Sequence, residues 1–258
     1  MSNDKIDMDK EKFIQQHIEM EKFFSGGFVP KGSPEAEGAI AENIEKPTKL
    51  KVTADEGKVK AELEQIVNEA KSCRKCEIAL TRLNSVPGEG SPLARIFFIG
   101  EAPGADEDAL GRPFVGRAGQ LLDKIIKAMG FERADVFIGN ILKCRPPENR
   151  SPKAEEIINC LPFLQRQIEV INPDIIIALG AYSAQALLET TKPIGQLRGQ
   201  FFDYYPGLGR KPIKLMATFH PAYLLRNYSP DNRRKVWEDM KKVLVELGLP
   251  VPEQGKND

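Results

Sequence analysis

Four short hydrophobic runs recur along the chain, and a helical pattern separates each run from the next. The runs are residues 95–100 (RIFFIG), 136–142 (VFIGNIL), 174–180 (DIIIALG) and 213–219 (IKLMATF). Hydrophobic residues follow helical spacing at 120–129, 153–171, 183–189 and 231–248. Short buried strands that alternate with helices are typical of a mostly parallel sheet with helices on both faces. We therefore predict an α/β fold, with the FFDYY run at 201–205 as a candidate edge strand.

The composition is that of a folded protein. The 258 residues are 41% hydrophobic and include 37 basic and 37 acidic residues, which excludes a disordered, collagen-like or coiled-coil chain. No hydrophobic run approaches the roughly 20 residues of a membrane-spanning helix, and the charged start MSNDKIDMDKEKF has no signal-peptide core. We therefore expect a cytoplasmic protein without a membrane partner. Zero net charge neither favours nor excludes nucleic acid, since only a local basic patch matters.

The chain divides into three parts. Residues 1–57 are rich in charged residues and poor in hydrophobic ones after the stretch KFFSGGFV, which predicts a flexible N-terminal extension and linker. Residues 6–24 are alternatively a short amphipathic helix that docks on a protein partner, although a loose tail is favoured. Residues 58–250 form the predicted globular domain, and 251–258 form a tail.

Four cysteines form a second pattern. Cys73 and Cys76 make a CxxC motif in the polar turn SCRKCE, and Cys144 and Cys160 follow. In the cytosol such cysteines bind metal more often than they form disulfides. Four thiolates can hold either a tetrahedral zinc ion or a 4Fe-4S cluster, and the spacing alone does not separate the two. We expect the site to have a structural role.

In a parallel sheet the ligand crevice lies beyond the carboxyl ends of the strands. This rule brings together the loops GEAPGADED at 100–108, KCRPPENRSP at 143–152 and HPAYLLRN at 220–227. The first loop lacks the GxGxxG fingerprint, so a nicotinamide cofactor is not expected. Its carboxylates are Glu101, Asp106, Glu107 and Asp108. Acidic residues there can cap a helix, orient water or bind a metal.

Three further side chains near this crevice have both a structural and a functional interpretation. Phe114 is either a core residue or a flat surface on which a base stacks. Asn140 either satisfies nearby backbone or reads a base edge with its adjacent donor and acceptor. His220 is a structural residue or, at the crevice rim, a catalytic one. Basic residues in the same loops could contact a phosphate backbone; they are Arg112, Arg117, Lys143, Arg145, Arg150, Arg198, Arg210, Lys211, Arg226, Arg233 and Arg234.

Taken together, the cysteine pattern and the motifs GEAPGADED, GRPFVGRAGQLL, GNILKCRPPENRSP and HPAYLLRN resemble the family 4 uracil-DNA glycosylases, the iron-sulfur type. The resemblance covers residues 63–247 and implies a three-layer α/β/α fold with a central four-stranded parallel sheet. It also implies a 4Fe-4S cluster on the four cysteines. The implied activity is the hydrolysis that removes uracil from single- or double-stranded DNA and leaves an abasic site, the first step of base excision repair.

The resemblance also implies roles for the crevice residues. Phe114 stacks on the flipped base, Asn140 bonds the uracil edge, and His220 donates to a uracil carbonyl. Glu101 and Glu107 orient water and offset positive charge on the sugar, and Glu107 is favoured for the water.

The same resemblance assigns the pocket lining and the DNA contacts. The backbone of Ala102 and Gly104 lines the pocket, and Arg198 and Arg226 hold the DNA strand. Family 1 members carry Asp at the position of Ala102, which leaves the water-orienting group open. We expect a monomer, with a protein partner for the N-terminal extension.

Three rival interpretations remain at this point. A related group captures uracil covalently through a His in an Arg-rich loop, but no His lies between Cys144 and Cys160. A second rival is a cluster-stapled uracil- or DNA-binding module without turnover. A third is an electron-transfer iron-sulfur protein.

Overall fold

A computed structural model of the chain describes residues 56–207 and 210–252. The predicted N-terminal extension, including its candidate helix at 6–24, lies outside the described residues apart from its last two positions. Those two are helical, because α2 (Glu56–Ser72) begins slightly before the predicted boundary at residue 57. The predicted C-terminal tail is described only at residues 251 and 252.

The described residues form one six-stranded sheet in the order β1-β3-β2-β4-β6-β5. The four predicted strands are its parallel centre: β2 (Ile96–Gly100), β3 (Phe137–Asn140), β4 (Ile175–Leu179) and β6 (Ile213–Thr218). The edges are antiparallel: β1 (Glu89–Gly90) pairs with β3, and β5 (Phe201–Tyr204) pairs with β6.

The expected number of four strands is therefore too low. The FFDYY candidate is confirmed as β5. Strand β1 escaped the sequence analysis because it has only two residues, one charged and one glycine, so it shows no hydrophobic alternation.

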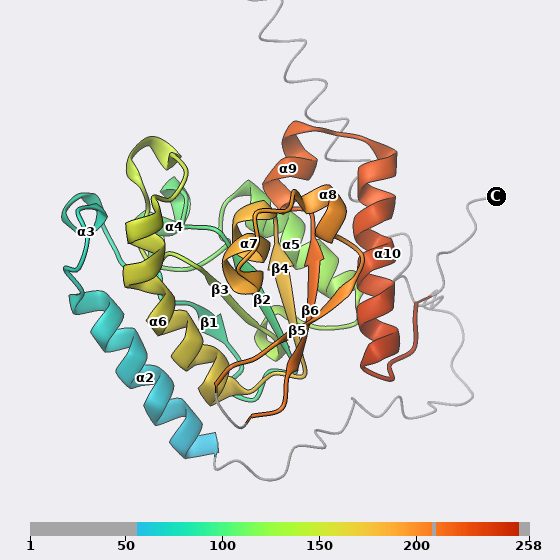
Figure 1. Cartoon of the computed structure of the whole chain (residues 1–258), viewed down its shortest axis with the longest axis horizontal. Coiled ribbons are helices and arrows are strands. Elements are labelled where there is room, and N and C mark those ends of the chain that lie inside the picture. Colours follow the sequence, from blue (N-terminus) through green and yellow to red (C-terminus); the bar gives the residue numbers. More distant parts are fainter. Residues whose placement is uncertain (1–55, 208–209, 253–258) are drawn as a thin grey trace, which may run out of the picture.

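Helices cover both faces of the sheet and complete the three layers (Figure 1). On one face the core includes residues of α2, α6 (Ala154–Ile171), α7 (Ala181–Leu188) and α8 (Ile194–Leu197). On the other it includes residues of α5 (Arg117–Ala128), α9 (Pro221–Arg226) and α10 (Pro230–Glu246). Short helical turns in the connections are α3 (Ile78–Thr81), α4 (Ala105–Leu110), η1 (Arg133–Asp135) and η2 (Pro147–Asn149).

The hydrophobic runs fill both cores because successive side chains of a strand point to opposite faces. In β2, Phe97 and Ile99 belong to the core under α2 and α6, whereas Ile96 and Phe98 belong to the core under α5 and α10. All five residues of β2 are buried. A central parallel strand buried on both sides therefore reads as a continuous hydrophobic run, which is why the sequence revealed it.

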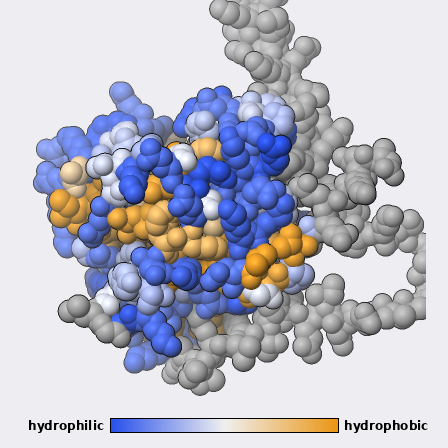
Figure 2. Space-filling model, turned by 45° about the vertical axis from the view of Figure 1, so that its right-hand side comes forward, coloured by the Kyte–Doolittle hydropathy of each residue, from blue (hydrophilic) through white to orange (hydrophobic). Residues whose placement is uncertain are grey.

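Large hydrophobic side chains that remain exposed come from separate elements. They are Leu80, Leu83, Leu110, Ile158, Tyr182, Tyr205 and Val245. On the face drawn in Figure 2, hydrophobic residues form separate areas within a mostly hydrophilic surface. Scattered exposed hydrophobic residues are normal for a globular protein. None of the helices in the described ranges has the length and hydrophobicity needed to cross a bilayer.

The contrast between the two sides of α6 gives a test of this packing. Leu164 is 0% exposed and Ile158 is 70% exposed in the same helix. Leu164→Ala removes buried methyl groups and leaves a cavity, so we expect it to lower the free energy of unfolding by about 2–5 kcal/mol. Ile158→Ala is the matched control and should stay within about 0.5 kcal/mol of the wild type. Chemical denaturation measures both, and equal losses would contradict the predicted packing.

Candidate active site and cysteine centre

A cavity of about 500 Å³ opens at the carboxyl ends of the parallel strands. The register places Gly100 of β2 beside Asn140 of β3, and Leu179 of β4 beside Thr218 of β6. The three predicted loops therefore line the cavity together, and the segment after β4, which was not predicted, joins them with Gly180, Ala181 and Tyr182. Its volume lies within the range that is typical of small-molecule pockets.

Asn140 presents an unsatisfied acceptor to this cavity. Asn140 is 1% exposed, and its side-chain Oδ1 has no hydrogen-bond partner among the described residues. A buried polar atom without a partner is costly unless a ligand supplies one. Gly100 provides the space, because a Cβ there would lie 2.4 Å from that oxygen and 2.6 Å from the Phe114 ring. The side chain is therefore positioned to receive a donor from a bound ligand.

Phe114 forms a wall of the cavity from a tightly held loop. Its φ of 50° lies in the left-handed region, which non-glycine residues adopt only when the surroundings hold them there. Arg133 donates hydrogen bonds to the carbonyls of Pro113 and Phe114. From the other side, Glu107 accepts from the backbone N–H groups of Val115 and Gly116, both at 2.9 Å. The ring is thus fixed in place before any ligand arrives.

His220 stacks on that ring, with centroids 5.6 Å apart. It caps α9, where its Nδ1 accepts a hydrogen bond of 3.0 Å from the backbone N–H of Ala222. Because Nδ1 is the acceptor, the proton of the neutral ring is on Nε2. Burial, together with the nearby Arg226 guanidinium, lowers the pKa of His220 to about 4. At neutral pH the cavity therefore holds an uncharged histidine with one N–H donor.

The two carboxylates that the sequence singled out differ in their surroundings. Glu107 accepts from the backbone N–H of Gly104 at 3.0 Å as well as from the loop that carries Phe114. Glu101 also lines the cavity, and no group in the described part of the chain donates a hydrogen bond to its side-chain carboxylate. Burial raises the pKa of Glu101, and the charge of Arg226 opposes this effect. Glu107 thus anchors the loops, while Glu101 keeps its oxygens for a ligand or water.

The lining also includes residues that were predicted and residues that were missed. Ala102 and Gly104 line the cavity, as expected. Asn149 lines it too, with a φ of 55° and its Oδ1 bonded to Arg145 Nε at 2.8 Å. Further lining residues that were missed include Ser151, Tyr182 and Tyr223, whereas Arg150 had been named only as a basic residue of the loop. Asn149 to Ser151 lie in the predicted crevice loop, whose turn-rich sequence has no periodicity that separates lining from outward-facing residues.

The two arginines expected to hold DNA have different environments. Arg226 is exposed at the cavity rim. Arg198 instead forms a bidentate ion pair with the buried Asp239 of α10 and lies over the ring of Phe219 at 5.4 Å. This pairing engages the Arg198 guanidinium within the protein, so that a role of Arg198 in holding the DNA strand stays a prediction. The sequence could not reveal the pairing, because Asp239 lies 41 positions away in another element.

Several other residues of the predicted basic rim are also engaged within the protein. Arg112 pairs with Glu89, and Arg150 pairs with Glu156. Lys143 is only 1% exposed, so it cannot contact a phosphate backbone. The basic rim is therefore smaller than the loop sequences suggest.

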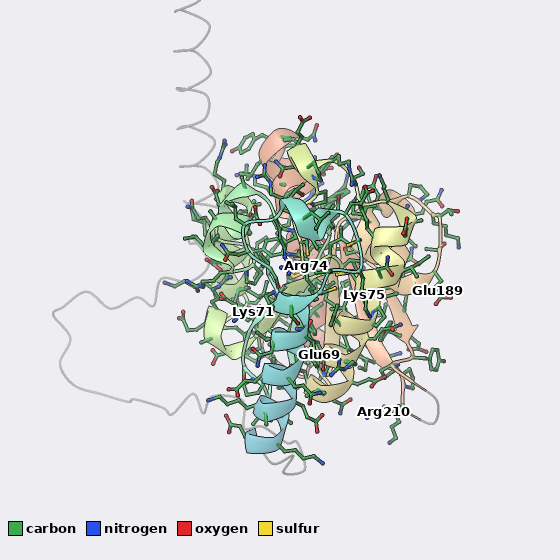
Figure 3. All side chains as sticks on the ribbon, turned by 90° about the vertical axis from the view of Figure 1, so that its left-hand side faces the viewer. Glu69, Lys71, Arg74, Lys75, Glu189 and Arg210 are labelled. Atoms are coloured by element: carbon green, nitrogen blue, oxygen red, sulfur yellow. The ribbon has the colours of Figure 1, made fainter. Side chains whose placement is uncertain are left out.

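The four cysteines come together on the other side of the loop that follows β3. Cys144 and Cys160 are buried, while Cys73 and Cys76 are half-buried in the turn after α2. Burial raises the pKa of Cys76, and the nearby Cys144 and Cys73 thiols add to the effect. Burial likewise raises the pKa of Cys160 to about 11, with contributions from Cys144 and Cys76. Lys71, Arg74 and Lys75 surround this turn (Figure 3).

The sulfur environment suits thiolate ligands. Arg82 Nη1 lies 2.8 Å from Cys144 Sγ, and the backbone N–H of Lys143 lies 3.1 Å from Cys160 Sγ. Such donors stabilise negative charge on sulfur and are typical around metal-bound thiolates. Over the described ranges no three or more His, Cys, Asp or Glu side chains converge on a position for a metal ion.

Comparison with known proteins agrees with this site. Residues 87–241 match the family model of the uracil DNA glycosylase superfamily. The chain is 50% identical over 183 residues to the type-4 uracil-DNA glycosylase of Thermotoga maritima, covering 70% of this chain and 93% of that protein. It is 47% identical over 186 residues to that of Sulfurisphaera tokodaii, covering 70% and 83%. The corresponding enzyme of Archaeoglobus fulgidus is 45% identical over 186 residues, covering 70% and 91%. The chain therefore belongs to the uracil DNA glycosylase superfamily and, within it, to the type-4 uracil-DNA glycosylases.

Proposed function

We propose that the protein takes uracil out of the DNA stack into the cavity and hydrolyses the bond between the base and the sugar. The observation that carries this proposal is the buried, unpartnered Oδ1 of Asn140 next to the Phe114 ring. An enzyme that acts on a base must first flip the nucleotide out of the duplex, at a cost of a few kcal/mol. Stacking on the rigid Phe114 ring and a hydrogen bond to the unpaired Asn140 Oδ1 offset part of that cost.

The hydrogen-bond pattern of uracil matches Asn140. Uracil has an N3–H donor beside the O4 acceptor, so the amide can accept from N3–H with Oδ1 and donate to O4 with its nitrogen. Cytosine reverses both positions, with an acceptor at N3 and an amino group at C4. Binding cytosine would leave the buried Oδ1 unpaired, which costs about 1–3 kcal/mol. Asn140 is thus the proposed selector of uracil over cytosine.

His220 is the proposed stabiliser of the leaving base. When the bond between C1′ and N1 breaks, its electron pair moves to the uracil and negative charge develops on O2. The neutral His220 ring carries its proton on Nε2 because Nδ1 is occupied by Ala222. Donation of this N–H to O2 stabilises the departing anion without a proton having to be transferred.

A carboxylate is proposed to orient the attacking water and to stabilise the positive charge on the sugar. A water molecule adds to C1′ as the base leaves with the electron pair. The proton that the water loses passes to the carboxylate and then through solvent to the uracil anion, so that the products are an abasic site and neutral uracil. We assign the water to Glu101, although the sequence favoured Glu107, because the Glu107 carboxylate already accepts three backbone N–H groups. The ionised Glu101 also offsets the positive charge that grows on the sugar.

We infer that Cys73, Cys76, Cys144 and Cys160 hold a 4Fe-4S cluster. When bound, the cluster ties α2 to α6 and to the loop after β3 and supplies no step of the reaction, since hydrolysis transfers no electrons. The donors to Cys144 and Cys160 support this ligand set. The cytoplasmic location, the monomeric state, the partner of residues 1–57 and the choice between single- and double-stranded DNA remain predictions.

A binding module without turnover is the alternative function. It predicts retention of uracil-containing DNA and no abasic product, whatever residue stands at position 220. The neutral histidine aimed at the cavity favours the enzyme, because a donor reserved for developing charge adds little to ground-state binding.

The direct test uses oligonucleotides with one U, T or C at a fixed site, followed by alkaline cleavage of abasic sites. We expect cleavage only at U, from both single-stranded and duplex substrates, and no protein-DNA adduct on a denaturing gel. An adduct would support covalent capture. If metal-loaded protein leaves the uracil-containing oligonucleotide intact, the proposed function is wrong.

The state of His220 predicts an unusual pH dependence. The ring stays neutral above about pH 5, because its pKa is lowered to about 4. The single-turnover rate should therefore show no inflection near pH 6.5, the ordinary value for histidine. His220→Ala should lower that rate about 10²- to 10³-fold at every pH in this range. An inflection near 6.5 that disappears in the variant would show that the charged ring is involved.

The cluster assignment is tested by analysis of the protein purified without air. We expect iron and acid-labile sulfide in equal amounts and visible absorption from iron-sulfur charge transfer. Cys144→Ser should lose most of both and unfold at a lower temperature, since a ligand to a structural metal is removed. Stoichiometric zinc without sulfide would contradict the assignment.

A further inference from the structure

We propose that Lys143 is a positioning residue, which, together with Gln167, fixes the peptide group of Asn140 and thereby the amide that reads the base. This inference rests on the proposed function and extends it to a lysine that does not touch the substrate. The last residue of β3 lies beyond the end of the neighbouring strand β1.

The carbonyl of Asn140 has no neighbouring strand to bond. The two ends of a trans peptide group point in opposite directions, and the N–H of Ile141 bonds to Gly100 O of β2 at 3.0 Å. The carbonyl of Asn140 therefore points away from β2, towards the side of β1. Strand β1 pairs only with Phe137 and Ile138, so it ends before it reaches this carbonyl.

Lys143 occupies the place of the missing strand. Its Nζ donates to Asn140 O at 2.9 Å and to Gln167 Oε1 at 2.7 Å. Gln167, which is 0% exposed in α6, then donates from Nε2 to Pro87 O at 2.9 Å. A buried chain of hydrogen bonds thus runs from the base-reading residue to the segment that precedes β1.

The arrangement explains why a charged residue is kept in the interior. Burying an ammonium group is costly unless it is hydrogen-bonded and lies near negative charge. Two acceptors hold Nζ, and the backbone N–H of the same residue bonds to Cys160 Sγ at 3.1 Å. Burial lowers the pKa of Lys143 to about 8, and the nearby Cys160 opposes this decrease. The lysine therefore sits between the cysteine centre and the base pocket.

Both sides of the Asn140 peptide group are thus fixed. On the β2 side, Ile141 bonds to Gly100 and Leu142 N bonds to Glu101 O at 3.0 Å. On the other side, Lys143 is the one residue in the described ranges that bonds to it. Without the ammonium, the peptide group can tilt and carry the amide away from the base. Misplacement of a binding group by about 1 Å can cost on the order of 10²-fold in rate.

The test is a double-mutant cycle on the metal-loaded protein. Lys143→Met keeps the length of the side chain and removes the ammonium, and Lys127→Met makes the same change on the exposed side of α5. We expect Lys143→Met to lower single-turnover excision about 10- to 100-fold with iron and sulfide content unchanged, and Lys127→Met to have no effect. In an Asn140→Ala background, Lys143→Met should change the rate by less than about 2-fold, since coupled residues are not additive.

Gln167→Leu provides a second cycle that leaves the lysine in place. It removes the acceptor that orients Nζ, and we expect a smaller loss of rate that also vanishes with Asn140→Ala. If Lys143→Met does not fold, this second cycle still tests whether Lys143 positions Asn140. Equal losses in both backgrounds, or full activity of both variants, would overturn the positioning role while the wild type still excises uracil. A wild type that excises no uracil would overturn the proposed function and this inference with it.

Discussion

The carboxyl ends of four parallel strands meet at one edge of the sheet, and the whole active site depends on this arrangement. Glu101 follows β2, Asn140 ends β3, and His220 follows β6. The strands are fixed there by burial on both faces, since every residue of β2, β3 and β4 is buried. The backbone that carries the proposed site residues is therefore rigid, and short loops form the rest of the pocket. Glu107 and Arg133 do this for Phe114 by holding both sides of its backbone.

A single short segment joins the base pocket to the cysteine centre. Asn140, at the end of β3, faces the cavity, and Cys144 lies among the thiols only four positions later. The proposed cluster would thus brace the loop that directly follows Asn140, the residue proposed to select the base. In this arrangement, loss of the proposed cluster would also disturb the position of Asn140. One stretch of backbone therefore carries both Asn140, which faces the base pocket, and Cys144, a proposed cluster ligand, and Lys143 lies between them.

The sequence predicted the parts of the fold that follow from local periodicity. The four hydrophobic runs became the parallel centre of the sheet, and the loops at their ends line the cavity. Local patterns did not reveal contacts between distant elements. Arg198 looked like a DNA contact, but it pairs with Asp239, and Lys143 looked like a surface lysine although it is buried. Whether a basic side chain in a polar loop points outward depends on partners elsewhere in the chain.

The most direct measurement is a crystal structure of the protein with free uracil bound. The account predicts the base ring against Phe114, with N3 within hydrogen-bond distance of Asn140 Oδ1 and O2 within hydrogen-bond distance of His220 Nε2. The backbone carbonyl of Asn140 should keep its contact with Lys143. Uracil bound in another orientation, with Asn140 Oδ1 still unpaired or His220 bonded to no oxygen of the base, would contradict the account of how this pocket recognises and releases the base.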